Sequence, residues 1–132
     1  MQTRLIGLGI TGLADSLVLL GIRYGSVESL DMAARVMQTI CHVAYRASIQ
    51  LAREKGSFPA FDADAYLQGR FIQSLPADIR EDIAATGIRN SHLIAIAPTG
   101  TISLLANNVS SGIEPVFESC FRRRIRQPDG SL

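Results

Sequence analysis

The chain has 132 residues and a mass of 14.3 kDa, a size that fits one modest domain and argues against two. Hydrophobic residues make up 47% and charged residues 19%, which allows a packed core and excludes a wholly disordered chain. The net charge of +1 and the absence of tryptophan argue against a protein that binds nucleic acids or anionic membranes.

The N-terminal region is apolar from Leu5 to Ile22 and superficially resembles a signal peptide or a membrane span. Asp15 and several glycines interrupt it, so we expect neither targeting nor membrane insertion. An apolar opening of this kind is unusual for a free domain and indicates part of a larger core. Within this region, apolar side chains at helical spacing predict a short, mostly buried helix that starts at Ile10 and ends at Gly21.

The clearest predicted element is a long amphipathic helix between Ser26, its N-cap, and Gly56. Its apolar side chains step alternately by three and four residues and form one seam along about six turns. Arginine, glutamine and histidine side chains occupy the opposite, solvated side. The predicted seam consists of Leu30, Ala33, Met37, Ile40, Ala44, Ala47 and Leu51, and Val36 and Val43 widen it.

Short helices and about two strands are predicted after Gly56. The helices cover 63–73, 76–85 and 101–106, with Pro76 in the first turn of the second and Gly87 after its end. The helical spacing of apolar residues ends at Leu93 to Ala97, a continuously apolar run that is typical of a strand buried on both faces. A second strand is expected over 116–125. Because such strands need neighbours, we expect an α/β protein whose other strands lie elsewhere.

The strongest candidate for a binding site is the turn between the first predicted strand and the next helix. Amide groups at a helix N-terminus lack intrahelical partners and favour anions. Three hydroxyls, and a glycine that permits close approach, complete a cradle for phosphate that needs no lysine. On pattern alone a plain helix cap is the alternative. The turn consists of Pro98, Thr99, Gly100, Thr101, Ile102 and Ser103.

Other motifs give weaker signals. Gly7, Gly9 and Gly12 form a GxGxxG pattern, but no strand precedes it, and tight packing is favoured over dinucleotide binding. Glu114 lies in a loop, where a solvated turn residue is the alternative to a site residue. A basic cluster is either a solvated sheet edge or a phosphate contact. It consists of Arg122, Arg123, Arg124 and Arg126.

Cys41 and Cys120 are the two cysteines and lie far apart in the chain. With His42 and His92 they form no metal-ligand spacing, so no metal site is expected. Cys41 is predicted to be an inert core thiol, and no nearby histidine supports Cys120 as a nucleophile. Two cysteines in such a chain indicate a reduced, cytoplasmic protein, although one disulfide between them stays open.

Four segments occur in the same order as in the large catalytic subunit of ribonucleotide reductases, which they resemble. Their sequences look most like the adenosylcobalamin-dependent class. They are RLIGLGITGLAD at residues 4–15, LGIRYGS at 20–26, AIAPTGTIS at 95–103 and SGIEPVF at 111–117. The resemblance covers about residues 4–126 and is specific because several motifs agree in order. It implies that residues 1–132 form a single partial domain, from the C-terminal part of that family's ten-stranded α/β barrel.

The resemblance also implies a reaction. Enzymes of this family reduce ribonucleotides to 2′-deoxyribonucleotides for DNA replication by thiyl-radical chemistry. The implied partners are a ribonucleotide substrate, the rest of the barrel and, in the intact enzyme, adenosylcobalamin; a membrane or direct nucleic-acid binding is not expected. The implied phosphate-binding residues are Pro98, Thr99, Gly100, Thr101, Ile102 and Ser103, which agrees with the phosphate cradle and outweighs the plain cap.

Several family motifs are missing from the chain. The radical-bearing cysteine, with its nearby asparagine and glutamate, and the reducing cysteine pair precede the matched region. Neither Cys41 nor Cys120 matches their context, so we expect the chain to be inactive alone. The alternative is a small helical interaction module without catalysis, suggested by the seam from Leu30 to Leu51. A phosphate-binding module from an unrelated enzyme is a third, weaker possibility.

Overall fold

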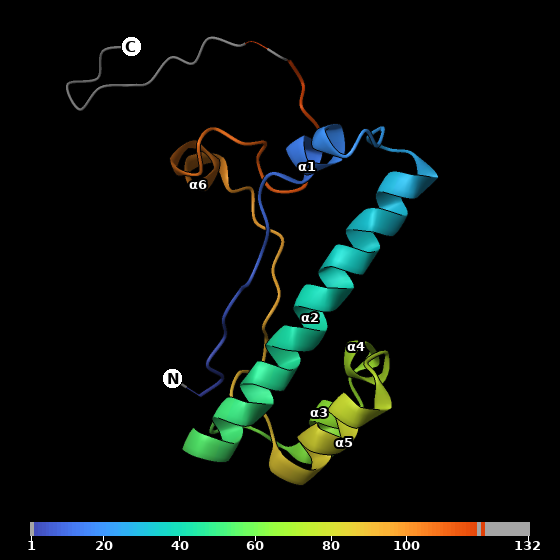
Figure 1. Ribbon diagram of the computed structural model, residues 1–132. Coiled ribbons are helices and arrows are strands. Elements are labelled where there is room, and N and C mark those ends of the chain that lie inside the picture. The colour runs from blue at the N-terminus through green and yellow to red at the C-terminus, as the bar shows by residue number, and fades with distance from the viewer. Residues whose placement is uncertain (1, 119, 121–132) are drawn as a thin grey trace, which may run out of the picture.

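The computed structural model describes residues 2–118 and 120 (Figure 1). The longest helix runs diagonally through the picture, with three short helices at one end and the remaining two toward the other (Figure 1). The described part of the chain is therefore built around one rod that connects two groups of short elements. The helices are α1 (Leu13–Leu19), α2 (Val27–Lys55), α3 (Ala63–Leu67), α4 (Arg70–Gln73), α5 (Ala77–Thr86) and α6 (Gly100–Leu105).

Local chemistry sets both ends of α2. At its start, the Ser26 side-chain oxygen accepts a hydrogen bond from the Ser29 N–H at 3.2 Å, as expected of an N-cap. At its end, Gly56 adopts a φ of 76°, which favours glycine, and its N–H donates to the Ala52 carbonyl oxygen at 2.8 Å. The long helix predicted between Ser26 and Gly56 is confirmed.

The buried face of α2 differs from the predicted seam. Leu30 and Val43 belong to that prediction, but their side chains are 66% and 61% exposed. Burial is concentrated in the second half of the helix because α5 packs there, tied to it by the Arg46–Asp78 and Arg53–Asp82 ion pairs at 2.7 and 2.9 Å. The buried residues of α2 are Ser29, Cys41, Ala44, Tyr45, Ser48, Ile49 and Ala52.

The main hydrophobic core lies between the second half of α2 and α5. Ile79 and Ile83 of α5, and Ile88 just beyond it, have no exposed surface. As predicted, Gly87 ends α5, with a φ of 82°, whereas Pro76, predicted in the first turn, is the N-cap residue just before the helix. The core cluster contains Cys41, Ala44, Tyr45, Ile49, Phe58, Ile72, Leu75, Ile79, Ile83, Ile88 and Leu93.

Aromatic side chains close the core beside α3. The rings of Phe58, Phe61 and Tyr66 pack edge to face, with centroid separations of 5.4 to 5.9 Å. The single helix predicted over 63–73 is interrupted, because the chain leaves the helical path at Gly69, whose N–H donates to the Tyr66 carbonyl oxygen at 3.1 Å. Two short helices, α3 and α4, therefore replace it.

The predicted fold class, an α/β fragment of a ten-stranded barrel, is contradicted in the described residues, which are helix-rich and contain no strand. The 93–97 run is extended and lies beside the N-terminal segment, joined by one parallel bridge between Leu8 and Ile94 (Figure 1). The Leu8 N–H donates to the Leu93 carbonyl oxygen at 2.7 Å, and the Ala95 N–H donates to the Leu8 carbonyl oxygen at 3.0 Å.

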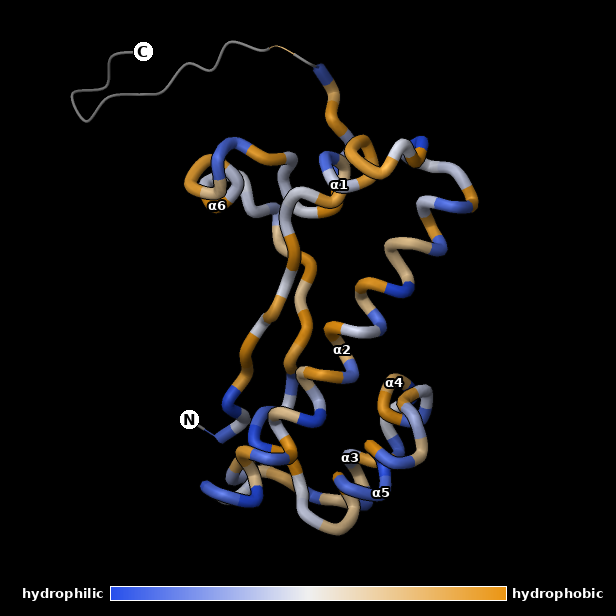
Figure 2. The backbone as a smooth tube through the Cα atoms, in the orientation of Figure 1, coloured by the Kyte–Doolittle hydropathy of each residue, from blue (hydrophilic) through white to orange (hydrophobic). Residues whose placement is uncertain are grey.

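The physical reason for this difference is that the predicted strand lacks a partner strand on one of its edges. A strand buried on both faces needs a neighbour on each edge, whereas the 93–97 run pairs along one edge and leaves Ile96 68% exposed. Apolar residues follow one another along both extended segments (Figure 2). The second predicted strand, over 116–125, falls mostly outside the described residues, and 116–118 and 120 are not in a strand.

The apolar N-terminal stretch divides into an extended segment and the short helix α1. Of the helices in the described ranges, none combines the length and the apolar character needed to cross a lipid bilayer. Helix α1 begins after Gly12, which has a φ of 80°, and the chain turns away after Leu20. Ala14 and Leu17 are its buried residues.

Candidate functional site

The predicted phosphate turn lies at the N-terminus of α6, at the end of the molecule away from α3 to α5 (Figure 1). The Ser103 N–H makes the first intrahelical bond, to the Thr99 carbonyl oxygen at 2.8 Å. The amides of Gly100, Thr101 and Ile102 precede that bond, so they need partners from outside the helix. A Cβ placed on Gly100 would meet no atom within 4 Å, so the space beside these amides is open.

The three hydroxyls of the turn have different surroundings. The Ser103 side chain is 2% exposed, and its hydroxyl donates to the Gly100 carbonyl oxygen at 2.9 Å. The Thr99 hydroxyl donates to the hydroxyl of Thr11 at 3.1 Å and accepts from the Gly112 N–H. Thr101 is exposed to solvent. The sequence predicted three equivalent hydroxyl donors. Among the described residues, however, only the Thr101 hydroxyl is free of hydrogen bonds.

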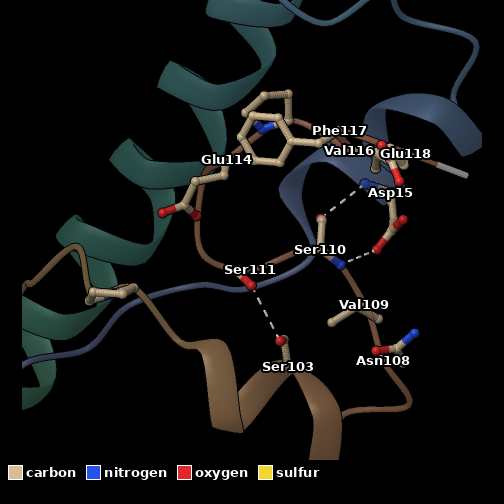
Figure 3. Close-up of a pocket in the computed structure, with 12 residues that line it drawn as sticks. Asp15, Ser103, Asn108, Val109, Ser110, Ser111, Glu114, Val116, Phe117 and Glu118 are labelled. Atoms are coloured by element: carbon tan, nitrogen blue, oxygen red, sulfur yellow. Dashed lines mark hydrogen bonds between the residues drawn. The ribbon is translucent and has the colours of Figure 1, made fainter. Parts of the chain in front are cut away.

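The loop after α6 is clamped against the start of α1. Asp15 accepts a hydrogen bond from the Ser110 N–H, and the Ser110 hydroxyl accepts one from the Asp15 N–H at 3.3 Å (Figure 3). The Ser110 carbonyl oxygen accepts from the Gly12 N–H at 2.7 Å and from the Thr11 hydroxyl at 2.8 Å. Sequence reasoning missed this clamp, and its one signal was a pair of polar residues, Thr11 and Asp15, inside an apolar stretch.

A cavity of about 680 Å³ adjoins the turn, within the size range of small-molecule sites. One oxygen of Glu114 is buried with no hydrogen-bond partner among the described residues. Leaving such an oxygen without a donor is costly, and Glu114 is one of the residues that line the cavity. The lining residues are Asp15, Pro98, Ser103, Asn108, Val109, Ser110, Ser111, Glu114, Pro115, Val116, Phe117 and Glu118 (Figure 3).

The glycine-rich run at residues 7–12 packs tightly, as predicted, but against the 93–97 segment rather than against a helix. A Cβ on Gly7 would lie 2.8 Å from the Ala95 Cβ, and one on Gly9 would lie 2.6 Å from the Ala95 carbonyl oxygen. Both distances are shorter than any ordinary contact, so these positions require glycine. The glycines of this run therefore allow the two backbone segments to approach closely.

The remaining candidates from the sequence lie apart from this site. Cys41 is buried in the core, where burial raises the pKa of its thiol, as expected of an inert cysteine. Cys120 is exposed, and both cysteines are free thiols. The arginine cluster at 122–126 lies outside the described residues. Glu114, left open between a turn and a site residue, lines the cavity.

Comparison with known proteins places the chain in a family. The family model described as the barrel domain of ribonucleotide reductase matches residues 1–131. The chain therefore belongs to the ribonucleotide reductase family. This membership replaces the alternatives of a helical interaction module and of an unrelated phosphate-binding module.

Individual relatives agree with the family model. The chain is 44% identical, over 93% of its length, to a vitamin B12-dependent ribonucleoside-diphosphate reductase of Mycobacterium tuberculosis. It is 41% identical, over 94% of its length, to the enzyme of the same name from Thermoplasma acidophilum. It is 35% identical, over 98% of its length, to a ribonucleoside-diphosphate reductase large subunit of Caenorhabditis elegans. The chain spans 14% to 18% of the length of these relatives.

Proposed function

We propose that this chain is one part of a vitamin B12-dependent ribonucleotide reductase and that it supplies the loop that binds the substrate phosphates. The substrate would be a ribonucleotide, and the product the corresponding 2′-deoxyribonucleotide for DNA replication. The names of the relatives from Mycobacterium tuberculosis and Thermoplasma acidophilum support the cofactor class. Residues 1–132 would form a single partial domain of a cytoplasmic enzyme, with the rest of the reductase as its structural partner.

The observation that carries this proposal is the open N-terminus of α6. Three successive amides, those of Gly100, Thr101 and Ile102, precede the first intrahelical bond, and the exposed Thr101 hydroxyl lies beside them. Phosphate oxygens are acceptors that such amides bind well, and no lysine is needed. Pro98, Thr99 and Ser103 complete the loop by shaping it, since the hydroxyls of Thr99 and Ser103 are engaged within the protein.

The adjoining cavity has room for the rest of the nucleotide. Pro98 and Ser103 belong both to the loop and to the cavity lining, so a ligand held at α6 by its phosphates would extend into this space. The ribose and the base carry hydroxyl and amino donors, and Glu114 offers an unpartnered acceptor. We propose that the nucleoside lies in this cavity.

The radical chemistry is assigned to the remainder of the enzyme. Cys41 is buried in the helical core and Cys120 has no matching context, so neither is proposed as a catalytic cysteine. Adenosylcobalamin would supply the radical when bound. We therefore assign the binding of this cofactor mainly to the remainder of the enzyme.

The phosphate site is tested in the complete reductase by Gly100→Ala and Thr101→Ala. The added methyl at Gly100 would enter open space in the free protein but would occupy the place of a phosphate. We expect the equilibrium affinity for a ribonucleotide to fall about 10- to 100-fold, the range for losing hydrogen bonds to a charged group. Thr39→Ala, on the exposed side of α2, is the matched control. Unchanged affinity in both loop variants would contradict the site.

The division of labour is tested with the 132-residue chain alone. Supplied with a ribonucleotide, adenosylcobalamin and a dithiol, it is expected to form no deoxyribonucleotide, because the proposed catalytic cysteines lie elsewhere. Product formation, measured by chromatography, would show that this segment contains the reactive thiol.

A further inference from the structure

A continuous chain of hydrogen bonds links the phosphate loop to two distant segments. The Gly112 N–H donates to the Thr99 hydroxyl oxygen, which donates to the Thr11 hydroxyl at 3.1 Å. The Thr11 hydroxyl in turn donates to the Ser110 carbonyl oxygen at 2.8 Å. Residues 11, 99 and 110–112 are thereby held together at the base of α6.

This chain of hydrogen bonds uses the proton of the Thr99 hydroxyl. A hydroxyl has one proton to donate, and that of Thr99 is directed to Thr11, so it is not available to a phosphate oxygen. Thr99 also has a φ of 50° and a ψ of 22°, a left-handed conformation that is rare for a β-branched residue. Such a conformation persists only where the surroundings hold it in place.

We propose that Thr99 and Thr11 are positioning residues, which hold the left-handed turn and thereby aim the first amides of α6 at the substrate phosphates. The proposal rests on the proposed function of the loop. In this role Thr99 does not bind the phosphate itself but holds in place the amides that do. It also gives Thr11, at the end of the glycine-rich run, a part in substrate binding through Thr99.

The packing around this network supports the proposal. Gly12, next to Thr11, donates its N–H to the same Ser110 carbonyl oxygen at 2.7 Å. A Cβ on Gly112 would lie 2.8 Å from the Ala97 carbonyl oxygen, so its backbone approaches the loop as closely as a glycine allows. The Asp15–Ser110 pair closes the other side of the same loop. The Thr99 hydroxyl therefore lies between two backbones that are themselves fixed.

The test uses Thr11→Val, Thr11→Ser and Thr99→Val in the complete reductase. Valine keeps the shape of threonine and removes the hydroxyl, whereas serine keeps the hydroxyl. We expect Thr11→Val to raise the KM for the ribonucleotide about 10-fold, because the hydrogen bonds of Thr11 with Thr99 and with the Ser110 carbonyl oxygen are lost, with kcat changed less than about twofold. Thr11→Ser should restore the KM of the unchanged enzyme. Thr39→Val on α2 is the matched control.

A double-variant cycle distinguishes positioning from independent contacts. If Thr11 acts through Thr99, the Thr11→Val/Thr99→Val double variant should bind the ribonucleotide no more weakly than Thr99→Val alone. Additive effects, or an unchanged KM for Thr11→Val, would overturn the proposal. If Thr99→Val fails to fold, Thr99→Ala takes its place in the cycle, because alanine also lacks the hydroxyl and is not β-branched.

The two proposals fail in different ways. If Gly100→Ala and Thr101→Ala leave ribonucleotide affinity unchanged, the phosphate site is wrong and the positioning role is lost with it. If those variants weaken binding while Thr11→Val leaves the KM unchanged, the phosphate site stands and only the positioning role of Thr11 and Thr99 is refuted.

Discussion

At the scale of single residues, Gly7 and Gly9 of the N-terminal run are required by space rather than by conformation. Gly9 has an ordinary φ, but a Cβ on it would lie 2.6 Å from the Ala95 carbonyl oxygen. Gly12, in contrast, has a φ of 80° as well as a neighbour in Val109. The same sequence motif therefore contains glycines that are needed for two different physical reasons.

We expect Gly9→Ala to destabilise the protein by about 1–3 kcal/mol, because a backbone carbonyl cannot move aside cheaply. Gly100→Ala is the matched control, since its methyl meets no atom within 4 Å. That variant should be neutral or more stable by up to about 1 kcal/mol, through the reduced entropy of the unfolded chain. Urea unfolding followed by circular dichroism measures both, and equal midpoints for the two variants would contradict the explanation.

The free energy of unfolding should decrease at alkaline pH, because the core contains one thiol and two phenols whose pKa values are raised by burial. Burial raises the pKa of the Cys41 thiol and of the Tyr45 and Tyr66 phenols. Each group holds its proton more tightly when folded, so this stability is complete at neutral pH. It is lost as the pH rises above about 8.5 for the thiol and about 10 for the phenols, where the unfolded chain ionises first.

The urea midpoint is therefore expected to fall between pH 8 and about pH 11. Cys41→Ala should reduce the decrease that begins at about pH 8.5, and Tyr66→Phe should reduce the decrease that begins at about pH 10. Each variant should also have a lower midpoint than the unchanged protein at pH 7. A midpoint that stays constant across this range in the unchanged protein would show that these groups ionise as easily in the folded chain as in the unfolded one.

At the scale of elements, α2 has two halves with different sources of stability. The second half is buried against α5, whereas the first half contains a single buried residue, Ser29. Its start therefore depends on local capping, in which the Ser26 side chain accepts the Ser29 N–H at 3.2 Å. Amphipathic spacing could not reveal this difference, because the apolar seam runs through both halves.

Ser26→Ala is expected to fray the first half of α2 while leaving the core in place. Loss of an N-cap costs about 1 kcal/mol, which corresponds to about fivefold faster amide exchange where opening is local. Hydrogen exchange should show this change at residues 27–40 and none at 41–55, and Ser26→Asp, which keeps a capping oxygen, should reverse it. A uniform change along the helix would mean that α2 opens as one unit.

At the scale of the whole molecule, the described residues fall into a helical core and a polar site region. The core cluster runs from Cys41 to Leu93 and holds most of the fully buried apolar side chains. The region of α1, α6 and the 109–112 loop is joined mainly by hydrogen bonds between polar groups. Apolar burial is the larger source of stability, so the two regions should differ in local stability.

Amide exchange in the 132-residue chain is expected to be slowest at 44–52 and 79–84 and much faster at 100–112. A ribonucleotide added at saturating concentration to the complete reductase should slow exchange at 100–112 specifically, because binding stabilises the segment that opens. Equal protection of both regions without ligand would contradict the division of the molecule into a core and a site region.

The start of α2 and the ends of α2 and α5 were predictable because their causes are local. Ser26 caps its own helix three residues on, and Gly56 and Gly87 end helices through their own left-handed φ values. The ordered motifs likewise predicted the family, which the match over residues 1–131 confirms. The strands were not predictable, because an apolar run such as 93–97 becomes a strand only when partners supply both edges.

The sequence alone identified the residues of the turn at the candidate site, since Pro98 to Ser103 are contiguous in the chain. Only the tertiary structure decided what each of their hydroxyls does. Thr99 is joined to Thr11 across 88 positions of sequence, and Thr11 to the Ser110 carbonyl oxygen across 99. Because a hydroxyl proton can be donated once, these long-range bonds engage Thr99 and leave Thr101 facing solvent. No local pattern carries that information.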